Sequence, residues 1–357
     1  KICLINNLYG ENSVGGAERV VEQRAREFLS DNKNEVFVLS LSSDKKQKFK
    51  KIKTKGINIC EIYIPNIFPY HNLSKHGFFA KVLWHFLDLF CQRGRFALKK
   101  FLKQNNFDIT ETHNMMGFQF GKNTFKNKNK KNIWRHFLHD VQLVEPSGVL
   151  LWDHRRDSLV QKIYSFIMKR KFRKVDEVIS PSEFLKEFYE ERRFFDKIKC
   201  VIETKNTRNK RQINHKLQIT NSEFLFVGSL VEHKGIKFLM EVWDNVKNKK
   251  NATLHIVGDG VLRSEVEQWA SEKENIKVYG RLEGDELEEV YNKCGTLIFP
   301  SICIENNPTV IHEAHEHGLK VIASNTGGVR ENVDKNDVLV EPGNVDEWVL
   351  SFEHLII

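Results

Sequence analysis

The stretch around Phe299–Asn332 constrains the fold of this chain most, because it contains a complete strand–helix–strand pattern. Two strand-like runs, Thr296–Pro300 and Lys320–Ser324, flank a short helix that we predict from about Pro308 to His317. Gly318 suits the end of that helix. Two strands joined through a helix form the unit from which parallel α/β sheets are built.

The start of the predicted helix has the properties of an anion site. Asn306 and Asn307 can cap it, and Pro308 suits its first turn. The first residues of a helix carry unpaired amides and a partial positive charge, and phosphate binds there. We therefore predict that a phosphate-bearing ligand contacts the amides of Thr309 and Val310.

Two glutamates flank this predicted site. Glu313 lies four residues after Thr309, so both side chains share one face of the helix. Glu313 would then lie near the sugar hydroxyls of the bound ligand, and Glu305 could reach its other side. A nucleotide diphosphate with a sugar at each end fits this arrangement. Taken alone, however, two glutamates are more often a solvated surface pair.

The residues around these glutamates resemble a known family signature. The spacing Glu305-x7-Glu313, followed by Gly318 and Gly327-Gly328, resembles the signature of the retaining GT-B glycosyltransferases grouped as family 4. One position departs from that signature, because Pro308 replaces a common glycine and has no backbone amide to donate. Any donor contact made by the glycine amide must therefore be absent here.

The resemblance implies a role for each matched residue. Glu313 is expected to bind the nucleotide ribose and Glu305 the donor sugar. The amides of Thr309 and Val310 are expected to hold the diphosphate, and Asn307 belongs to the same donor-binding loop.

A second matching element follows the predicted strand Glu223–Gly228. Its sequence SLVEHKG resembles the family pattern GRL-x-x-x-KG, whose Arg and Lys neutralise the leaving diphosphate. Lys234 matches the Lys and is expected to act in catalysis, while Ser229 takes the place of the Arg at the donor. Arg281 and Arg330 are both candidates to replace the missing cation.

The N-terminal half contributes two further matches. A predicted buried strand, Lys1–Leu8, leads to Gly15 and Gly16 in the sequence GGAERVV, which resembles the donor-facing N-terminal loop of the family. His139 stands in HDVQLVEPSG, which resembles a strand-end His-Asp pair. This resemblance makes His139 a catalytic candidate that could donate a hydrogen bond to the transferring sugar. A purely structural histidine, or a role for nearby His136 instead, also fits.

Strand–helix alternation in both halves predicts two Rossmann-like α/β domains. We place an N-terminal acceptor-side domain at 1–203, a linker at 204–222, and a C-terminal nucleotide-sugar-binding domain at 223–357. The resemblance implies the GT-B fold, in which the two domains face each other across an interdomain cleft.

The charge is unevenly distributed along the chain. Residues 1–200 carry 38 Lys+Arg and 22 Asp+Glu (+16), and residues 201–357 carry 18 and 25 (−7), which together give the net +9. A basic half is compatible with a solvated surface, a polyanionic acceptor or an anionic membrane. The apolar, aromatic stretch Phe78–Leu102 fits either a core helix or a face for a lipid-linked acceptor or bilayer. We predict no nucleic-acid partner, because no aromatic-interleaved or helix-turn-helix pattern accompanies the charge.

The composition bears on where in the cell this protein is found. No apolar run approaches the about 18 residues of a membrane-spanning helix. Six cysteines without a C-x-x-C pair predict reduced thiols and a cytoplasmic protein, with peripheral contact at the inner face of the plasma membrane as an option. Because Lys1 already lies in a predicted strand, we expect a short segment to precede it.

Metal and cofactor sites are not predicted. The run His312–His317 does not have the H-E-x-x-H spacing, and Gly258-x-Gly260 lacks the third glycine of a dinucleotide fingerprint.

The resemblance as a whole implies a retaining glycosyltransferase. Such an enzyme moves a sugar from a UDP- or GDP-sugar to a glycan or lipid-linked acceptor in the synthesis of a cell-surface polysaccharide or glycoconjugate. Two alternatives stay open, namely a catalytically silent GT-B subunit and a non-transferring GT-B enzyme such as a nucleotide-sugar epimerase or hydrolase.

Overall fold

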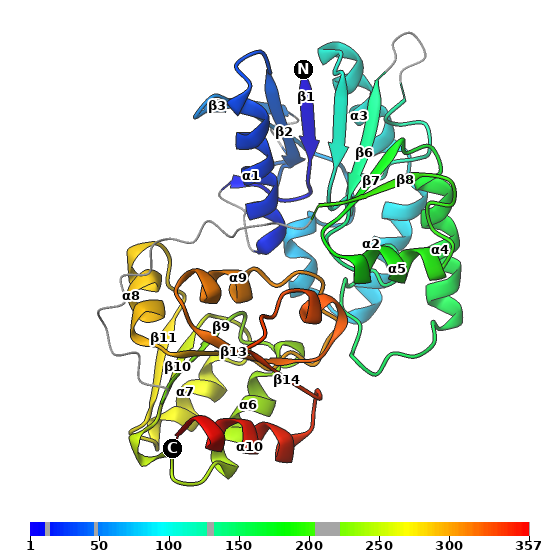
Figure 1. The fold of residues 1–357 in the computed structure, drawn as a ribbon. Coiled ribbons are helices and arrows are strands. Elements are labelled where there is room, and N and C mark those ends of the chain that lie inside the picture. The colour runs from blue at the N-terminus through cyan, green and yellow to red at the C-terminus, as the bar shows by residue number, and fades with distance from the viewer. Residues whose placement is uncertain (11–14, 46–48, 127–131, 204–221, 357) are drawn as a thin grey trace. The chain divides into compact units, whose positions relative to one another are not determined.

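The computed structural model describes residues 1–10, 15–45, 49–126, 132–203 and 222–356 (Figure 1). These residues form two compact units, each built on one sheet. Except for Ser222, the predicted linker 204–222 lies outside the described residues. Unit 1 comprises Lys1–His139, Ser158–Pro181 and Lys186–Glu203, and unit 2 comprises Asp140–Asp157, Ser182–Leu185 and the described part of Thr204–Ile357. Unit 2 thus takes in two short segments from within the predicted N-terminal domain.

Unit 1 contains an eight-stranded sheet in the order β3-β4-β2-β1-β5-β6-β7-β8. Neighbouring strands run parallel, except that β3 pairs antiparallel with β4. The strands are β1 (Ile2–Ile5), β2 (Val36–Leu41), β3 (Phe49–Thr54), β4 (Ile57–Ile62), β5 (Ile109–Thr112), β6 (Ile133–Phe137), β7 (Glu177–Ser180) and β8 (Lys199–Ile202). The helices are α1 (Gly16–Ser30), the 3-10 helix η2 (Tyr70–Lys75), α2 (Phe78–Phe90), α3 (Arg93–Asn105), α4 (Leu159–Phe172) and α5 (Glu183–Glu191), the first turn of which belongs to unit 2.

Unit 2 contains a six-stranded parallel sheet in the order β11-β10-β9-β12-β13-β14, which is the Rossmann strand order. The strands are β9 (Glu223–Val227), β10 (Thr253–Val257), β11 (Ile276–Gly280), β12 (Thr296–Phe299), β13 (Lys320–Ser324) and β14 (Val338–Val340). The helices are η3 (Glu232–Lys234), α6 (Ile236–Asn245), η4 (Lys249–Asn251), α7 (Arg263–Ser271), α8 (Asp285–Lys293), α9 (Thr309–Glu316), η5 (Gly327–Glu331) and α10 (Val345–Ile356).

Alternate side chains of the unit 2 strands enter two separate cores. Phe224 and Phe226 of β9 point into a core shared with α6, α7 and α10, whereas Leu225 points into a core shared with α8 and α9. Helices therefore cover both faces of this sheet, as its near-continuous apolar strands require (Figure 1). Trp348 and Phe352, four residues apart on α10, both lie in the first core.

Unit 1 differs from the sequence analysis at two places. The stretch Phe78–Leu102 is not one helix, because the chain turns to an extended conformation at Cys91 and divides it into α2 and α3. Strand β3 was not predicted, because its sequence FKKIKT carries three lysines and its side chains are mostly exposed. Lysines on an edge strand oppose further pairing, which explains why this strand lacks the apolar pattern of the others.

Helix α1 buries polar as well as apolar side chains against the sheet. Val21 and Ala25 are buried as expected, but Glu18 and Arg24 are buried beside them. A buried charged residue needs a partner within the protein, so α1 carries polar groups into the interior of unit 1.

Each unit has one point where the strand order reverses. In unit 1, β2 and β5 flank β1, and in unit 2, β10 and β12 flank β9. Loops that leave the carboxyl ends of strands at such a point diverge and leave a crevice in which α/β proteins bind ligands. The residues that follow β1, β5, β9 and β12 are therefore the first places to look for a site. None of the helices in the described ranges is long and apolar enough to cross a membrane.

Candidate active site

Lys234 and Glu305 meet in unit 2 after the two strands at the reversal point. Lys234 follows β9 through η3, and Glu305 follows β12. The Lys234 Nζ lies 2.6 Å from the Glu305 Oε1, and Ser301 Oγ donates to the same oxygen at 2.8 Å. The exposed fraction is 32% for the lysine side chain and 13% for the glutamate side chain. The two predicted catalytic residues of this unit thus form one partly buried ion pair.

Burial and the ion pair together determine the protonation states of Lys234 and Cys303. Burial alone would lower the pKa of Lys234, but the Glu305 carboxylate outweighs it and raises that pKa above its ordinary value. Burial, followed by the negative charge of Glu305, raises the pKa of the Cys303 thiol to about 12. At neutral pH Lys234 is therefore a cation and the Cys303 thiol is protonated. Lys234 is thus the positively charged group of this cluster, and Cys303 adds no charge to it.

The loop that carries Glu305 is held in place by close backbone contacts. Gly327 has φ +56°, and a Cβ there would lie 2.1 Å from the Glu305 carbonyl oxygen. The Gly328 amide donates to that same carbonyl at 2.8 Å. On the other side, a Cβ on Gly235 would lie 1.9 Å from the Pro300 carbonyl oxygen. Likewise, a Cβ on Gly328 would lie 2.1 Å from the Asn306 carbonyl oxygen. Gly235, Gly327 and Gly328 must therefore be glycine, because only glycine allows the segments to approach this closely.

The predicted helix is α9, which begins at Thr309 with Pro308 as its N-cap. The predicted capping by Asn306 and Asn307 is wrong, because no side chain caps this helix. Both asparagines are used elsewhere. Asn306 accepts a hydrogen bond from Ser182 Oγ, and Asn307 Oδ1 lies 2.7 Å from His312 Nε2.

Glu313 is oriented by α8. Tyr291 Oη donates to Glu313 Oε2 at 3.0 Å, and the Tyr291 ring stacks on His317 with 4.7 Å between ring centroids. His317 in turn contacts the Glu313 carbonyl and the Glu288 carboxylate, at 2.7 and 2.9 Å. Tyr291 was not singled out from the sequence, because it lies in a different helix, 22 residues before Glu313.

The histidines of α9 and its C-cap have separate partners. His312 contacts Asn307, His315 contacts Asp337 at 2.8 Å, and His317 contacts Glu288. Within the residues that the structure describes, no three His, Cys, Asp or Glu side chains are grouped so as to hold a metal.

The remaining predicted donor residues of unit 2 also have defined places. Ser229 is exposed, two residues after the end of β9. Of the two candidates for the missing cation, Arg281 pairs with Glu283 at 2.7 Å, and Arg330 donates to Asn325 at 3.3 Å.

In unit 1, Gly15 and Gly16 stand at the start of α1, as predicted. Gly15 is the N-cap, and its amide donates to the Glu18 carboxylate at 2.8 Å. The side chain of Glu18 also lies within 3.5 Å of Asn6, which follows β1. A carboxylate of the protein therefore contacts one of the amides at the start of α1.

His139 belongs to a polar chain at the carboxyl ends of β5 and β6. Its Nε2 lies 2.8 Å from Nδ1 of His113, and Nε2 of His113 lies 3.3 Å from the Glu111 carboxylate. Arg24 of α1 makes two hydrogen bonds to Glu111 and two to Glu203, the latter at 2.8 Å each. His136, the rival candidate, is buried and lies 2.9 Å from the Thr112 carbonyl oxygen.

Burial and charge fix the protonation of this chain. Burial alone would raise the pKa of Glu111, but its contacts with His113 and Arg24 lower that pKa to about 2. Burial lowers the pKa of His113 below its ordinary value, against the opposing pull of Glu111. At neutral pH, Glu111 is an anion and His113 is uncharged. The polar sequence Glu111–His113 was the available signal for this cluster, but nothing in the sequence paired it with His139.

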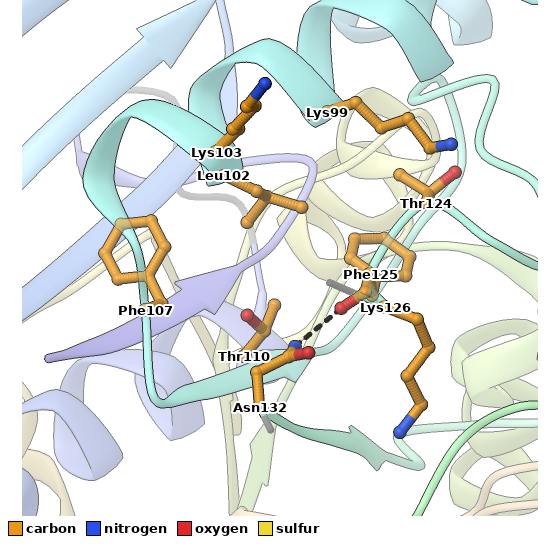
Figure 2. A pocket seen from close by; sticks show the side chains of 9 residues that line it. All are labelled: Lys99, Leu102, Lys103, Phe107, Thr110, Thr124, Phe125, Lys126 and Asn132. Atoms are coloured by element: carbon orange, nitrogen blue, oxygen red, sulfur yellow. Dashed lines mark hydrogen bonds between the residues drawn. The ribbon is translucent and has the colours of Figure 1, made fainter. Parts of the chain in front are cut away.

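A separate pocket of about 160 Å³ lies in unit 1 (Figure 2). It opens beside Phe107 and Asn132, which precede β5 and β6, so it lies at the end of the sheet opposite to His113. Lys99 and Lys103 of α3 border it, and Asn132 donates to the Phe125 carbonyl at 2.6 Å within it. The residues that line this pocket therefore do not include those of the polar chain around His139.

Comparison with known families identifies the chain. Residues 14–202, which are 189 of the 357, match the model for "Glycosyltransferase Family 4", and residues 221–356 match the model for "Glycosyl transferases group 1". The chain belongs to glycosyltransferase family 4. The family predicted from the Glu305–Glu313 signature is thereby confirmed.

Curated relatives are similar over different shares of the chain. An uncharacterized 42.6 kDa protein in the cps region of Klebsiella pneumoniae is 25% identical over 92% of this chain and 86% of its own length. An uncharacterized glycosyltransferase of Methanocaldococcus jannaschii is 31% identical over 34% of this chain and 32% of its own length. A lipopolysaccharide 1,2-N-acetylglucosaminetransferase of Salmonella typhimurium is 27% identical over 44% of this chain and 46% of its own length. The last two are thus matched over less than half of their length.

Solved structures confirm the GT-B fold for this family 4 chain. Sucrose-phosphate synthase of Thermosynechococcus elongatus has a TM-score of 0.69 at 18% identity, covering 99% of this chain and 91% of that one. The Anabaena protein HepE in complex with UDP has a TM-score of 0.64 at 14% identity, covering 100% and 90%. At these identities the likeness concerns the fold alone.

The glycine contacts of the Glu305 loop give a first prediction. Gly327 and Gly343 both have positive φ, so an alanine at either position is strained by about 1 kcal/mol. Only Gly327→Ala also drives a Cβ into the Glu305 carbonyl, which should destabilise unit 2 by about 1–3 kcal/mol more. Urea unfolding of Gly327→Ala and of the control Gly343→Ala measures the difference. Equal losses of stability in the two variants would contradict the packing described.

The buried carboxylate Glu111 gives a second prediction. Its pKa of about 2 lies below the ordinary value of 4.5, so its stabilising contribution is present above that value and is lost as the pH falls toward 2. Between pH 5 and pH 2, the wild-type protein should lose about 3 kcal/mol more unfolding free energy than Glu111→Gln. Urea unfolding across this pH range tests the prediction. Parallel acid limbs for the two proteins would show that Glu111 does not titrate in this way.

Proposed function

We propose that this chain is a retaining glycosyltransferase. It moves a sugar from a UDP- or GDP-linked donor to a glycan or lipid-linked acceptor during synthesis of a cell-surface polysaccharide or glycoconjugate. The observation that carries this proposal is the Lys234–Glu305 ion pair at the strand-order reversal of unit 2, with Glu305 four residues before the start of α9. The Klebsiella relative lies in a cps region, and HepE was solved with UDP and with UDP-glucose, which supports the substrate class.

The donor is proposed to bind in unit 2 through charge and hydrogen bonding. Lys234 and the amides of Thr309 and Val310 hold the diphosphate, because a cation and a helix start both favour phosphate. Glu313, oriented by Tyr291, accepts hydrogen bonds from the ribose hydroxyls. Glu305 accepts hydrogen bonds from the hydroxyls of the transferred sugar.

Further residues complete the proposed donor site. Asn307 and Ser229 lie on the loops that carry Glu305 and Lys234, and Gly15 and Gly16 contribute backbone at the start of α1. His139 donates a hydrogen bond to the transferring sugar near its reacting carbon.

The proposed reaction is a front-face displacement. The bond between the anomeric carbon and the diphosphate oxygen breaks, and the electron pair leaves with the nucleotide diphosphate. The acceptor hydroxyl attacks the same face, and its proton passes to the departing diphosphate oxygen, so the anomeric configuration is retained. Lys234 stabilises the charge that develops on the diphosphate, which is worth about 10²–10³ in rate for one well-placed donor.

Donor binding gives a third prediction. Among UDP-, GDP- and ADP-sugars, a matching donor at 100 times its dissociation constant should stabilise the protein by about 2.7 kcal/mol. Glu313→Ala should abolish this shift, whereas Glu316→Ala, one turn further along the same helix, should keep it. Thermal unfolding with each nucleotide sugar measures both effects. The absence of a shift with any donor would count against the proposal.

The same proteins separate the proposed function from its alternatives. Sugar transfer to an acceptor extract with retained configuration, seen by NMR of the product, supports the transferase. Release of free sugar or an epimerised nucleotide sugar would instead identify a non-transferring enzyme. If Lys234→Ala and Glu305→Ala leave the biological activity intact, the chain is a catalytically silent subunit.

We further propose that unit 1 contacts an anionic membrane at the inner face of the plasma membrane, where a lipid-linked acceptor would be presented. Helix α2 exposes a row of large apolar side chains, with 86% of Phe79 exposed. The row consists of Phe78, Phe79, Val82, Leu83, Phe86 and Phe90. The only acidic residue of α2, Asp88, is buried and is attracted by Lys171 of α4.

Helix α4 has the same character. Leu159, Val160, Ile163 and Phe166 are exposed, and the helix contains basic residues but no acidic one. Apolar side chains among cations are the composition of a surface that binds anionic lipid. This exposed face favours the membrane interpretation of Phe78–Leu102 over the core interpretation for α2.

Vesicle binding gives a fourth prediction. Sedimentation with phosphatidylglycerol-containing vesicles should retain the wild-type protein. Phe79→Ser/Phe86→Ser/Phe90→Ser should weaken binding by at least about tenfold, because each phenylalanine loses its burial in lipid. Val261→Ser/Leu350→Ser, which removes two exposed apolar side chains of unit 2, is the matched control. Equal retention of all three proteins, or none with anionic vesicles, would refute the membrane surface.

A further inference from the structure

Five side chains form a continuous polar chain inside unit 1. They run from Glu203 through Arg24, Glu111 and His113 to His139. They come from α1 and β5 and from the segments that follow β5, β6 and β8. Glu111 is fully buried, and Arg24 and His113 are each at least nine-tenths buried. His139, at the end of this polar chain, is half-buried, and a histidine that only packs against a neighbour does not need so ordered a set of partners.

The contacts determine where each proton lies. Arg24 binds both oxygens of Glu111, and this bidentate pairing keeps the carboxylate charged. The nitrogen of His113 that faces this anion is Nε2. Its 3.3 Å separation from Glu111 is an ion-pair distance without hydrogen-bond geometry, and a bare lone pair there would be repelled by the carboxylate. Nε2 of His113 therefore carries its proton, and the neutral ring leaves Nδ1 as an acceptor.

The next contact then has only one arrangement. Nδ1 of His113 and Nε2 of His139 lie 2.8 Å apart, which is hydrogen-bond distance. Since Nδ1 of His113 accepts, Nε2 of His139 must donate. The alternative tautomer of His139 would place two lone pairs against each other.

We propose that His113, held by Glu111 and Arg24, is a positioning residue that fixes the proton of the His139 ring on Nε2. The effect on the ring follows from the contacts within unit 1. Its consequence for sugar transfer rests on the proposed function, because His139 is the residue placed at the transferred sugar. A histidine whose tautomer and orientation are set by a charged partner is a recurring device in catalysis.

The surrounding groups are consistent with this assignment. Arg24 and the two carboxylates Glu111 and Glu203 carry a net charge of −1, so they do not oppose a proton on the nearby ring. His136, the other ring close to His113, is buried, and burial lowers its pKa to about 3, so it is uncharged at neutral pH.

Two variants of His113 test the proposal. Asn places its Oδ1 where the histidine has Nδ1, so His113→Asn keeps an acceptor for His139, whereas His113→Leu has a similar size and offers none. The side-chain ¹⁵N shifts of His139 should be measured at pH 8, above the ordinary histidine pKa of about 6.5. We expect an Nε2–H tautomer in the wild type and in His113→Asn, and a mixture of tautomers in His113→Leu.

The outcomes separate this proposal from the proposed function. A proton on Nδ1 of His139 in the wild type, or an unchanged tautomer in His113→Leu, would overturn the positioning role. If the chain transfers sugar, kcat of His113→Leu should fall by about tenfold or more with little change in KM for the donor, and His113→Asn should recover most of it. A chain that transfers no sugar would refute the proposed function while the ¹⁵N result still decides the positioning of His139.

Discussion

The ion pair between Lys234 and Glu305 is the interaction on which the organisation of unit 2 depends. It lies where the strand order reverses, so the loops after β9 and β12 bring opposite charges together at one edge of the sheet. A partly buried pair of this kind is retained only if its geometry is held, since a displaced partner leaves an unpaired charge behind. The close contacts of Gly235, Gly327 and Gly328 supply that restraint.

In unit 1 the buried charged groups are paired in a different arrangement. Its charged groups are more deeply buried, and they satisfy one another in a chain from Glu203 to His139 rather than in a single pair. Because Arg24 belongs to α1 and Glu111 to β5, their hydrogen bonds also hold α1 against the sheet. In both units, therefore, the polar residues lie at or just after the carboxyl ends of central strands.

Two features of unit 1 depart from the simplest folding rule, which buries apolar side chains and exposes charged ones. The apolar side chains of α2 and α4 are exposed, although burying them would stabilise the fold. Glu18 and Arg24 are charged residues in the interior, where an apolar side chain would need no partner. Residues that depart from the simplest folding rule in this way are the ones most readily explained by function.

The sequence by itself determined the fold class and the family, because strand and helix periodicities are local and the Glu305–Glu313 signature is contiguous. It placed β9, β12, β13 and α9 to within about two residues, which is the usual error for element ends. It did not show β3, whose lysines hide the strand pattern, or the break between α2 and α3. Only the tertiary structure decided that Tyr291 orients Glu313, that both asparagines before α9 are used elsewhere, and that His113 lies against His139. These contacts join residues from different elements of the chain, and their pairing depends on strand order and packing, which no local pattern in the sequence specifies.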